Sequence, residues 1–212
     1  MNRNKIKGLY CVIDSAWVEL SVAGQWAEKL VQAGVEIIQL RAKDDGSRAV
    51  LEAACAVRAA TKGKALFIVN DRLDIALLSG ADGVHLGQDD IPLSEARRLM
   101  PSGIIGVSTH NLEEAREAES FGADYISFGP IFQTKTKKDA DIPKGLEGLR
   151  ALAPNIGIPI VAIGGITADS AVPVLEAGAS SVAIISDILL AEDIGGRAAG
   201  IISRIRTALK ER

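Results

Sequence analysis

Phe121-Gly122-Ala123-Asp124, followed at once by Tyr125-Ile126-Ser127-Phe128, is the stretch that decides the fold. Its glycine suits the left-handed backbone that ends a helix, and the apolar run after it has the length of a buried strand. The same order of helix end, glycine and apolar run recurs at 33–35, 79–82 and 176–179. Because no hairpin turn joins two strands directly, the pattern predicts parallel strands connected by right-handed crossovers.

Eight apolar runs recur at intervals of roughly 20 to 30 residues, the length of a strand and a helix. They are 9–13, 35–40, 65–69, 83–86, 104–107, 125–128, 158–163 and 181–185. Helices are predicted between or after them, among others at 20–32, 47–61, 111–120, 167–176 and 196–209. We therefore predict an α/β protein with a single domain over residues 1–212, a (β/α)8 TIM barrel. The alternative is a doubly wound open sheet, which would normally carry a glycine-rich turn after the first strand, where this chain has Asp14-Ser15.

Composition narrows the class of protein. Hydrophobic residues make up 48% of the chain but aromatic residues only 4%, as in parallel strands of Val, Ile, Leu and Ala covered by helices. The net charge of -3 argues against a nucleic-acid partner. No apolar run approaches the ~18 residues of a membrane span, and the N-terminus lacks the apolar region of a signal peptide. Cys11 and Cys55 lie in apolar segments, so we expect two buried thiols in a cytoplasmic protein.

The carboxyl end of the second predicted strand carries a cluster of cations. In a barrel of this kind the active site is built where the strands end. Alternation along the strand gives Gln39, Arg41 and Lys43 one common face, directed into the barrel mouth. Two cations there are costly to bury without an anionic ligand. A basic edge on a solvated loop is the alternative, and it explains Lys43 better than Arg41.

Two carboxylates follow the next two strands. Asp71 comes after Asn70 at the end of the third strand, and Asp90 follows the fourth. Each alone is equally well explained as a helix cap. Because neighbouring strands bring them together at the mouth, the pair predicts a site for Mg²⁺, which prefers a few carboxylates with phosphate oxygens and water.

Further strand ends supply groups suited to phosphate. Ser108 follows the fifth strand, Gly164-Gly165 the seventh and Ser186 the eighth. Paired glycines allow backbone N–H groups to approach a phosphate, and the last two loops are the usual phosphate site of such barrels.

The segment 129–139 after the sixth strand combines hydroxyl and ammonium groups. Thr134 and Thr136 alternate with Lys135, Lys137 and Lys138. This composition suits a multiply charged anion, although a solvated basic loop is an equal alternative for such a cluster taken alone.

The sequence shows no Ser–His–Asp or Cys–His arrangement. Its histidines are His85 and His110. We expect His85 to line the pocket rather than to act as a general base. The predicted chemistry is therefore the departure of a charged leaving group that the site stabilises electrostatically.

Taken together, these motifs resemble the thiamine-phosphate synthase family over nearly the whole chain. The stretches that carry the resemblance are Gln39-Leu40-Arg41-Ala42-Lys43, Asn70-Asp71-Arg72, residues 81–90, Gly106-Val107-Ser108-Thr109-His110, residues 129–139 and Ile163-Gly164-Gly165-Ile166. The resemblance implies a transferase of thiamine biosynthesis with small-molecule substrates and no membrane or nucleic-acid partner. It would condense hydroxymethylpyrimidine diphosphate with (carboxy)thiazole phosphate to give thiamine phosphate and diphosphate, after dissociative loss of the diphosphate. The family also suggests a possible homodimer, and the sequence does not decide whether the thiazole carries a carboxylate.

The resemblance also implies roles for individual residues. The implied Mg²⁺ ligands are Asp71 and Asp90. The implied diphosphate-binding residues are Arg41, Lys43, Asn70, Ser108 and Lys137, of which all but Asn70 are also implied to be catalytic. Gln39 would contact the pyrimidine, with His85 and Tyr10 nearby, and the implied thiazole-phosphate residues are Thr134, Thr136, Gly165, Ile185 and Ser186. The chain departs from the family at Asp187, where a small residue is usual, so an extra carboxylate follows Ser186.

Two rival functions remain at the level of sequence. A thiazole tautomerase-like barrel of the same superfamily lacks much of the diphosphate and Mg²⁺ set, so the presence of Arg41, Lys43, Asp71, Asp90 and Lys137 speaks against it. A non-catalytic barrel that binds a phosphate ligand would need no carboxylate pair.

Overall fold

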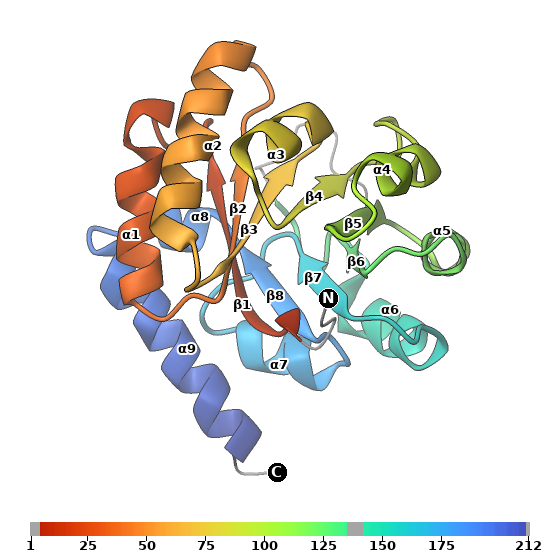
Figure 1. Cartoon of the computed structure of the whole chain (residues 1–212). Coiled ribbons are helices and arrows are strands. Elements are labelled where there is room, and N and C mark those ends of the chain that lie inside the picture. The colour runs from red at the N-terminus through yellow and green to blue at the C-terminus, as the bar shows by residue number, and fades with distance from the viewer. Residues whose placement is uncertain (1–4, 135–141, 211–212) are drawn as a thin grey trace.

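The computed structural model describes residues 5–134 and 142–210, and within these ranges eight parallel strands form a closed barrel (Figure 1). The strands pair in chain order, and β8 closes on β1. The strands are β1 (Gly8–Asp14), β2 (Ile37–Arg41), β3 (Leu66–Asn70), β4 (Gly83–Leu86), β5 (Ile104–Thr109), β6 (Tyr125–Phe128), β7 (Ile160–Ile163) and β8 (Ser181–Ile184). The predicted (β/α)8 barrel is confirmed.

Helices surround the barrel on the outside (Figure 1). They are α1 (Ala23–Gln32), α2 (Ser47–Thr61), α3 (Leu73–Ser79), α4 (Leu93–Leu99), α5 (Leu112–Ser120), α6 (Gly145–Leu152), α7 (Ala171–Glu176), α8 (Ser186–Leu189) and α9 (Ile194–Lys210), with short 3-10 helices η2 (Leu20–Val22) and η3 (Ala153–Asn155). The C-terminal helix α9 packs against α1 and α7. None of the helices described combines the length and the apolar character that a membrane crossing requires.

The glycines that mark the helix ends have the backbone that the sequence predicts. Gly34, Gly80, Gly122 and Gly178 have φ values of 91°, 68°, 88° and 114°. An L side chain is disfavoured in this region, so glycine allows the chain to leave each helix and enter the next strand within a few residues.

Three sequence expectations are corrected. The segment 20–32 is divided into η2 and α1. The helix expected from residue 167 begins at Ala171, because residues 167–170 form a turn in which Thr167 N–H donates to Ser170 Oγ over 2.9 Å. Cys55 is exposed on α2, whereas Cys11 is buried as expected.

The barrel interior has an apolar layer and a polar layer. Alternation along β1 directs Leu9, Cys11 and Ile13 toward the helices, and Tyr10 and Val12 into the barrel. The interior apolar cluster of buried side chains includes Ile37, Ile68, Ile104 and Val161 from different strands. The inward positions beyond this layer carry the polar side chains of Gln39, His85, Ser108 and Ser127. Strand alternation thus places these polar side chains directly next to a packed apolar layer.

Aspartates at the amino ends of β4 and β6 tie neighbouring elements together. Asp82 Oδ2 accepts hydrogen bonds from the Phe67 N–H and the Arg58 guanidinium, both over 2.8 Å. Asp124 Oδ2 accepts from the Ile105 N–H over 2.9 Å and from Arg97 over 2.5 Å. Each carboxylate therefore joins a strand start to a helix at the rim opposite the strand carboxyl ends.

We predict that Asp124→Ala lowers the free energy of unfolding by about 1.5–3 kcal/mol, because it leaves a part-buried guanidinium and a backbone N–H without this acceptor. The matched control is Glu147→Ala, which removes an equally short ion pair with Arg150 on the exposed surface of α6. Exposed pairs contribute little, so the control should change stability by less than about 0.5 kcal/mol. Urea unfolding of the two variants measures the difference, and equal losses would contradict the role given to Asp124.

Candidate active site

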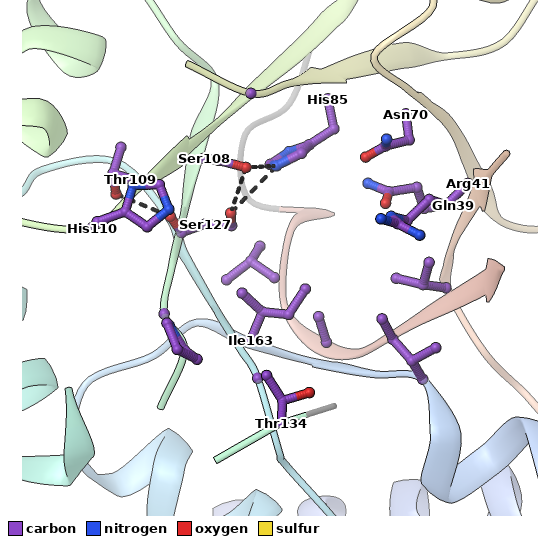
Figure 2. Close-up of a pocket in the computed structure, with 18 of the residues that line it drawn as sticks. Gln39, Arg41, Asn70, His85, Ser108, Thr109, His110, Ser127, Thr134 and Ile163 are labelled. Carbon is purple, nitrogen blue, oxygen red and sulfur yellow. Dashed lines mark hydrogen bonds between the residues drawn. The ribbon is translucent and has the colours of Figure 1, made fainter. Parts of the chain in front are cut away.

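One cavity of about 770 Å³ lies at the carboxyl ends of the strands. The predicted residues that line it are Gln39, Arg41, Lys43, Asn70, Asp71, Asp90, Ser108, Thr134, Gly165, Ile185 and Ser186. Figure 2 shows Gln39, Arg41 and Asn70 on one side, across from Ser108 and Ser127, with Thr134 at another edge. Thr136 and Lys137 lie outside the described residues. The structure thus brings every described residue of the predicted site to a single cavity.

Arg41 is held by an internal counter-ion that the sequence analysis did not assign. Its guanidinium donates to Asp14 Oδ2 over 2.7 Å, and the Asp14 side chain is only 1% exposed. Asp14 also accepts from the Ala16 N–H over 3.0 Å. Alternation along β1 could have placed Asp14 on the inward face, but its pairing with Arg41 depends on the register of β1 against β2. The pair fixes a cation at the rim before any ligand arrives.

Asp71 adopts a backbone conformation that is unusual for a residue with a side chain. Its φ is 61°, and it is the one residue other than glycine with a positive φ in the described part of the chain. Its N–H donates to the His85 carbonyl over 2.7 Å, and its carboxylate lies 3.1 Å from Lys43 Nζ. A left-handed residue held in place by such contacts is typical of functional sites, where strain serves to aim a side chain.

Asp90 is the second carboxylate at this rim. Its Oδ2 accepts from the Gly87 N–H over 2.6 Å. Burial raises the pKa of Asp90, and interaction with Asp71 raises it further, while the Gly87 hydrogen bond and Lys43 oppose the shift. The two carboxylates are therefore close enough to repel each other, and a bound divalent cation would relieve that repulsion.

The donor set fits Mg²⁺ better than a metal held by protein alone. No cluster of three or more His, Cys, Asp or Glu side chains able to hold a metal occurs among residues 5–134 and 142–210. Two carboxylates leave most of an octahedral shell to phosphate oxygens and water, as is usual for Mg²⁺.

Buried polar side chains form a continuous hydrogen-bonded floor. Gln39 Nε2 donates to Tyr10 Oη over 2.9 Å, and Tyr10 Oη lies 3.0 Å from Tyr125 Oη. Tyr125 Oη lies 3.0 Å from His85 Nδ1, and His85 Nε2 lies 3.0 Å from Ser108 Oγ. Tyr125 was absent from the predicted site, although its inward position on β6 could have indicated it. Burial raises the pKa of both tyrosines, so the floor is uncharged at neutral pH.

Burial also lowers the pKa of His85 to about 4, against a weaker opposing effect of Asp90. Both imidazole nitrogens already have hydrogen-bond partners within the protein. This arrangement suits a neutral side chain that orders its neighbours.

The glycine pair after β7 is required by the segment that follows β6. Gly164 and Gly165 have φ values of 99° and 65°. A Cβ on Gly164 would lie 2.5 Å from Pro130 Cβ, and one on Gly165 would lie 2.5 Å from the Gln133 carbonyl oxygen. The Phe132 N–H also donates to the Gly164 carbonyl over 2.9 Å. The start of the Lys/Thr segment is thus fixed against the glycine pair, and Thr134 reaches the same cavity.

Asp187 is directed away from the cavity. Its carboxylate accepts from the Ala168 N–H over 2.9 Å and from Arg197 on α9 over 2.7 Å. Ser186 and Ile185 line the cavity, whereas the charge that departs from the family pattern is paired outside it.

Comparisons with known proteins identify relatives of this chain. The family model described as thiamine monophosphate synthase matches residues 9–188. The thiamine-phosphate synthase of Halalkalibacterium halodurans is 51% identical over 171 residues, which are 80% of this chain and 81% of that protein. The thiamine-phosphate synthase of Pyrococcus furiosus is 44% identical over 193 residues, 91% of each chain.

Solved structures with a similar fold are also found. The thiamine phosphate pyrophosphorylase from Pyrococcus furiosus superposes with a TM-score of 0.86 at 39% identity, over 99% of this chain and 98% of that one. A 3-hexulose-6-phosphate synthase has a TM-score of 0.69 at 22% identity, over 96% of this chain and 99% of that one, and shares the fold alone.

From the lowered pKa of His85 we predict that the free energy of unfolding decreases in acid. The unfolded chain binds a proton at this imidazole below the ordinary value of 6.5, whereas the folded protein does so only near 4. Stability is therefore lost as the pH falls through this window, by at most about 1.4 kcal/mol per pH unit. Urea unfolding should show this decline in the wild type relative to His85→Gln. Parallel pH profiles for the two proteins would contradict it.

Proposed function

The chain belongs to the thiamine monophosphate synthase family, and from this premise we propose how its cavity carries out the family's reaction. The protein is a thiamine-phosphate synthase: it condenses hydroxymethylpyrimidine diphosphate with thiazole phosphate to give thiamine phosphate and diphosphate. The observation that carries our assignment of roles is the meeting of a cationic, carboxylate-bearing wall and a glycine-rich wall in one cavity.

We assign the diphosphate to the wall formed by β2 to β5. Arg41, fixed by Asp14, and Lys43 would bind its oxygens as cations. Asn70 and Ser108 would add neutral donors, so that the leaving group meets oriented charges and dipoles before the reaction begins.

Mg²⁺ is the cofactor that this wall would hold. Asp71 and Asp90 would be its protein ligands, and the diphosphate oxygens and water would complete its shell. Bound there, it would neutralise the charge that gathers on the departing diphosphate.

The neutral floor suits the pyrimidine ring. Gln39 donates its amide N–H to Tyr10 Oη, and burial favours the neutral forms of Tyr10, Tyr125 and His85 in this floor. A floor without a charged base supports a dissociative reaction, in which diphosphate leaves first and the thiazole nitrogen then captures the pyrimidine-methyl cation.

The thiazole phosphate is assigned to the glycine-rich wall. Gly165, Ile185, Ser186 and Thr134 line this part of the cavity. The roles of Thr136 with the acceptor phosphate and of Lys137 with the diphosphate remain proposals that rest on the family resemblance. The same holds for a homodimer, for a cytoplasmic location and for the choice between a plain and a carboxylated thiazole.

The rival functions have less support. A tautomerase-like barrel or a phosphate-binding barrel without catalysis has no use for two carboxylates gathered beside Lys43, or for an Asp71 backbone held in a left-handed conformation.

The direct test is to incubate the protein with both substrates and Mg²⁺ and to assay thiamine phosphate and diphosphate. We expect both products with Mg²⁺ and a large loss of turnover when the metal is chelated. Absence of product with metal and both substrates would contradict the function.

An exposed carboxylate outside the cavity provides a matched control for the metal site. Asp90→Ala should lower kcat by well over tenfold and weaken the dependence on Mg²⁺, because it removes one of the two proposed ligands. Asp169→Ala removes a carboxylate that is 84% exposed and does not line the cavity, and it should leave kcat within about twofold of the wild type. Equal effects of the two substitutions would contradict the assignment of Asp90.

A further inference from the structure

The hydrogen-bonded floor crosses the barrel from the proposed pyrimidine site to the proposed diphosphate site. It runs from Gln39 on β2 through Tyr10 and Tyr125 to His85, and ends at Ser108 on β5. The four links along this path are 2.9 or 3.0 Å long. The path is therefore a single connected network, in which one donor direction constrains the next.

Tyr125 lies at the centre of this network, and a glycine on the neighbouring strand leaves room for its ring. The Tyr125 side chain is fully buried beneath the cavity that it helps to line, and its hydroxyl lies between Tyr10 and His85. A Cβ on Gly106, the facing residue of β5, would lie 2.1 Å from the Tyr125 ring. The absence of a side chain at this inward position of β5 makes room for the tyrosine.

The direction of the hydrogen bonds follows from the first donor. An amide nitrogen only donates, so Tyr10 Oη accepts from Gln39. The Tyr10 hydrogen then has Tyr125 Oη as its acceptor, and the Tyr125 hydrogen has His85 Nδ1. In the opposite direction the Tyr10 hydrogen has no hydrogen-bond acceptor among the described contacts of the floor, which is costly in a buried position.

The same direction determines what Ser108 offers to a ligand. With Nδ1 accepting, the proton of His85 lies on Nε2 and is donated toward Ser108 Oγ over 3.0 Å. Ser127 Oγ lies 3.3 Å from the same nitrogen and donates to Ser108 Oγ over 3.5 Å (Figure 2). Ser108 Oγ is then an acceptor from two buried groups, and its own hydrogen is left for the cavity.

We propose that this buried relay, through Tyr125 and Ser127 as positioning residues, sets Ser108 as a hydrogen-bond donor to the departing diphosphate. The inference rests on the proposed function, since it concerns the same leaving group. It adds two residues that no resemblance assigned, and it gives the floor a part in the reaction beyond shaping the pyrimidine site.

The relay also links the two ends of one substrate. Because Gln39 uses Nε2 for Tyr10, its carbonyl oxygen is the amide atom left to accept from a donor on the pyrimidine, such as an exocyclic amino group. A ligand that donates there holds the amide in the orientation that drives the relay toward Ser108. A ring that accepts instead of donating at this point favours the opposite orientation.

The first test reads the tautomer of His85 without any substrate, so it remains decisive if the proposed function fails. The chain has two histidines, and a His110→Gln variant assigns the ¹⁵N signals of protein labelled at histidine. We expect His85 Nδ1 at the chemical shift of an unprotonated nitrogen and Nε2 at that of a protonated one. A proton on Nδ1 would overturn the inference.

The second test removes one hydroxyl and keeps the ring. Tyr125→Phe should let the two tautomers mix and should lower kcat by about tenfold or more, with a smaller change in KM. The control is Ser181→Ala. It also deletes a buried hydroxyl, which donates to the Gly8 carbonyl over 2.9 Å at the opposite end of the barrel. The control should keep the wild-type tautomer and kcat. Wild-type kcat in Tyr125→Phe, or an equal loss in Ser181→Ala, would overturn the positioning role.

Discussion

The parallel closure of the barrel is the constraint on which the rest of the structure depends. Because all strands run in one direction, every strand begins at one rim and ends at the other. At the first rim, Asp82 and Asp124 join strands to helices through backbone N–H groups and guanidinium groups. At the second rim the strand ends are free to carry catalytic side chains. Stability and chemistry are thus assigned to opposite ends of the same elements.

The cavity separates charged from neutral groups. The ion pairs Asp14–Arg41 and Lys43–Asp71 lie at the rim, where a diphosphate and a metal ion bring their own charges. The floor below contains serine and amide groups, which carry no charge, and tyrosine and histidine side chains whose neutral forms are favoured by burial. A reaction that separates a multiply charged diphosphate from a carbocation benefits from this division, since the anion meets cations and the ring meets neutral dipoles.

Local sequence signals sufficed for much of the fold and of the site. Glycine caps located the strand starts, and alternation at Gln39, Arg41 and Lys43 placed their side chains in the cavity. Local sequence patterns did not predict the contacts between segments that lie far apart in the sequence. The pairing of Asp14 with Arg41 requires the register of β1 against β2, and the pairing of Asp187 requires the position of α9. The start of α7 was placed too early because Thr167 and Ser170 are both good capping residues.

The central claim is that one wall of the cavity holds the metal and the leaving group while the other holds the acceptor phosphate. A crystal structure of the protein with Mg²⁺, diphosphate and thiamine phosphate tests it most directly. The account predicts a metal ion bound by Asp71 and Asp90 and sharing oxygens with diphosphate that contacts Arg41 and Ser108, with the product phosphate at Gly165 and Ser186. Diphosphate on the glycine-rich wall, or a metal ion away from both aspartates, would contradict it.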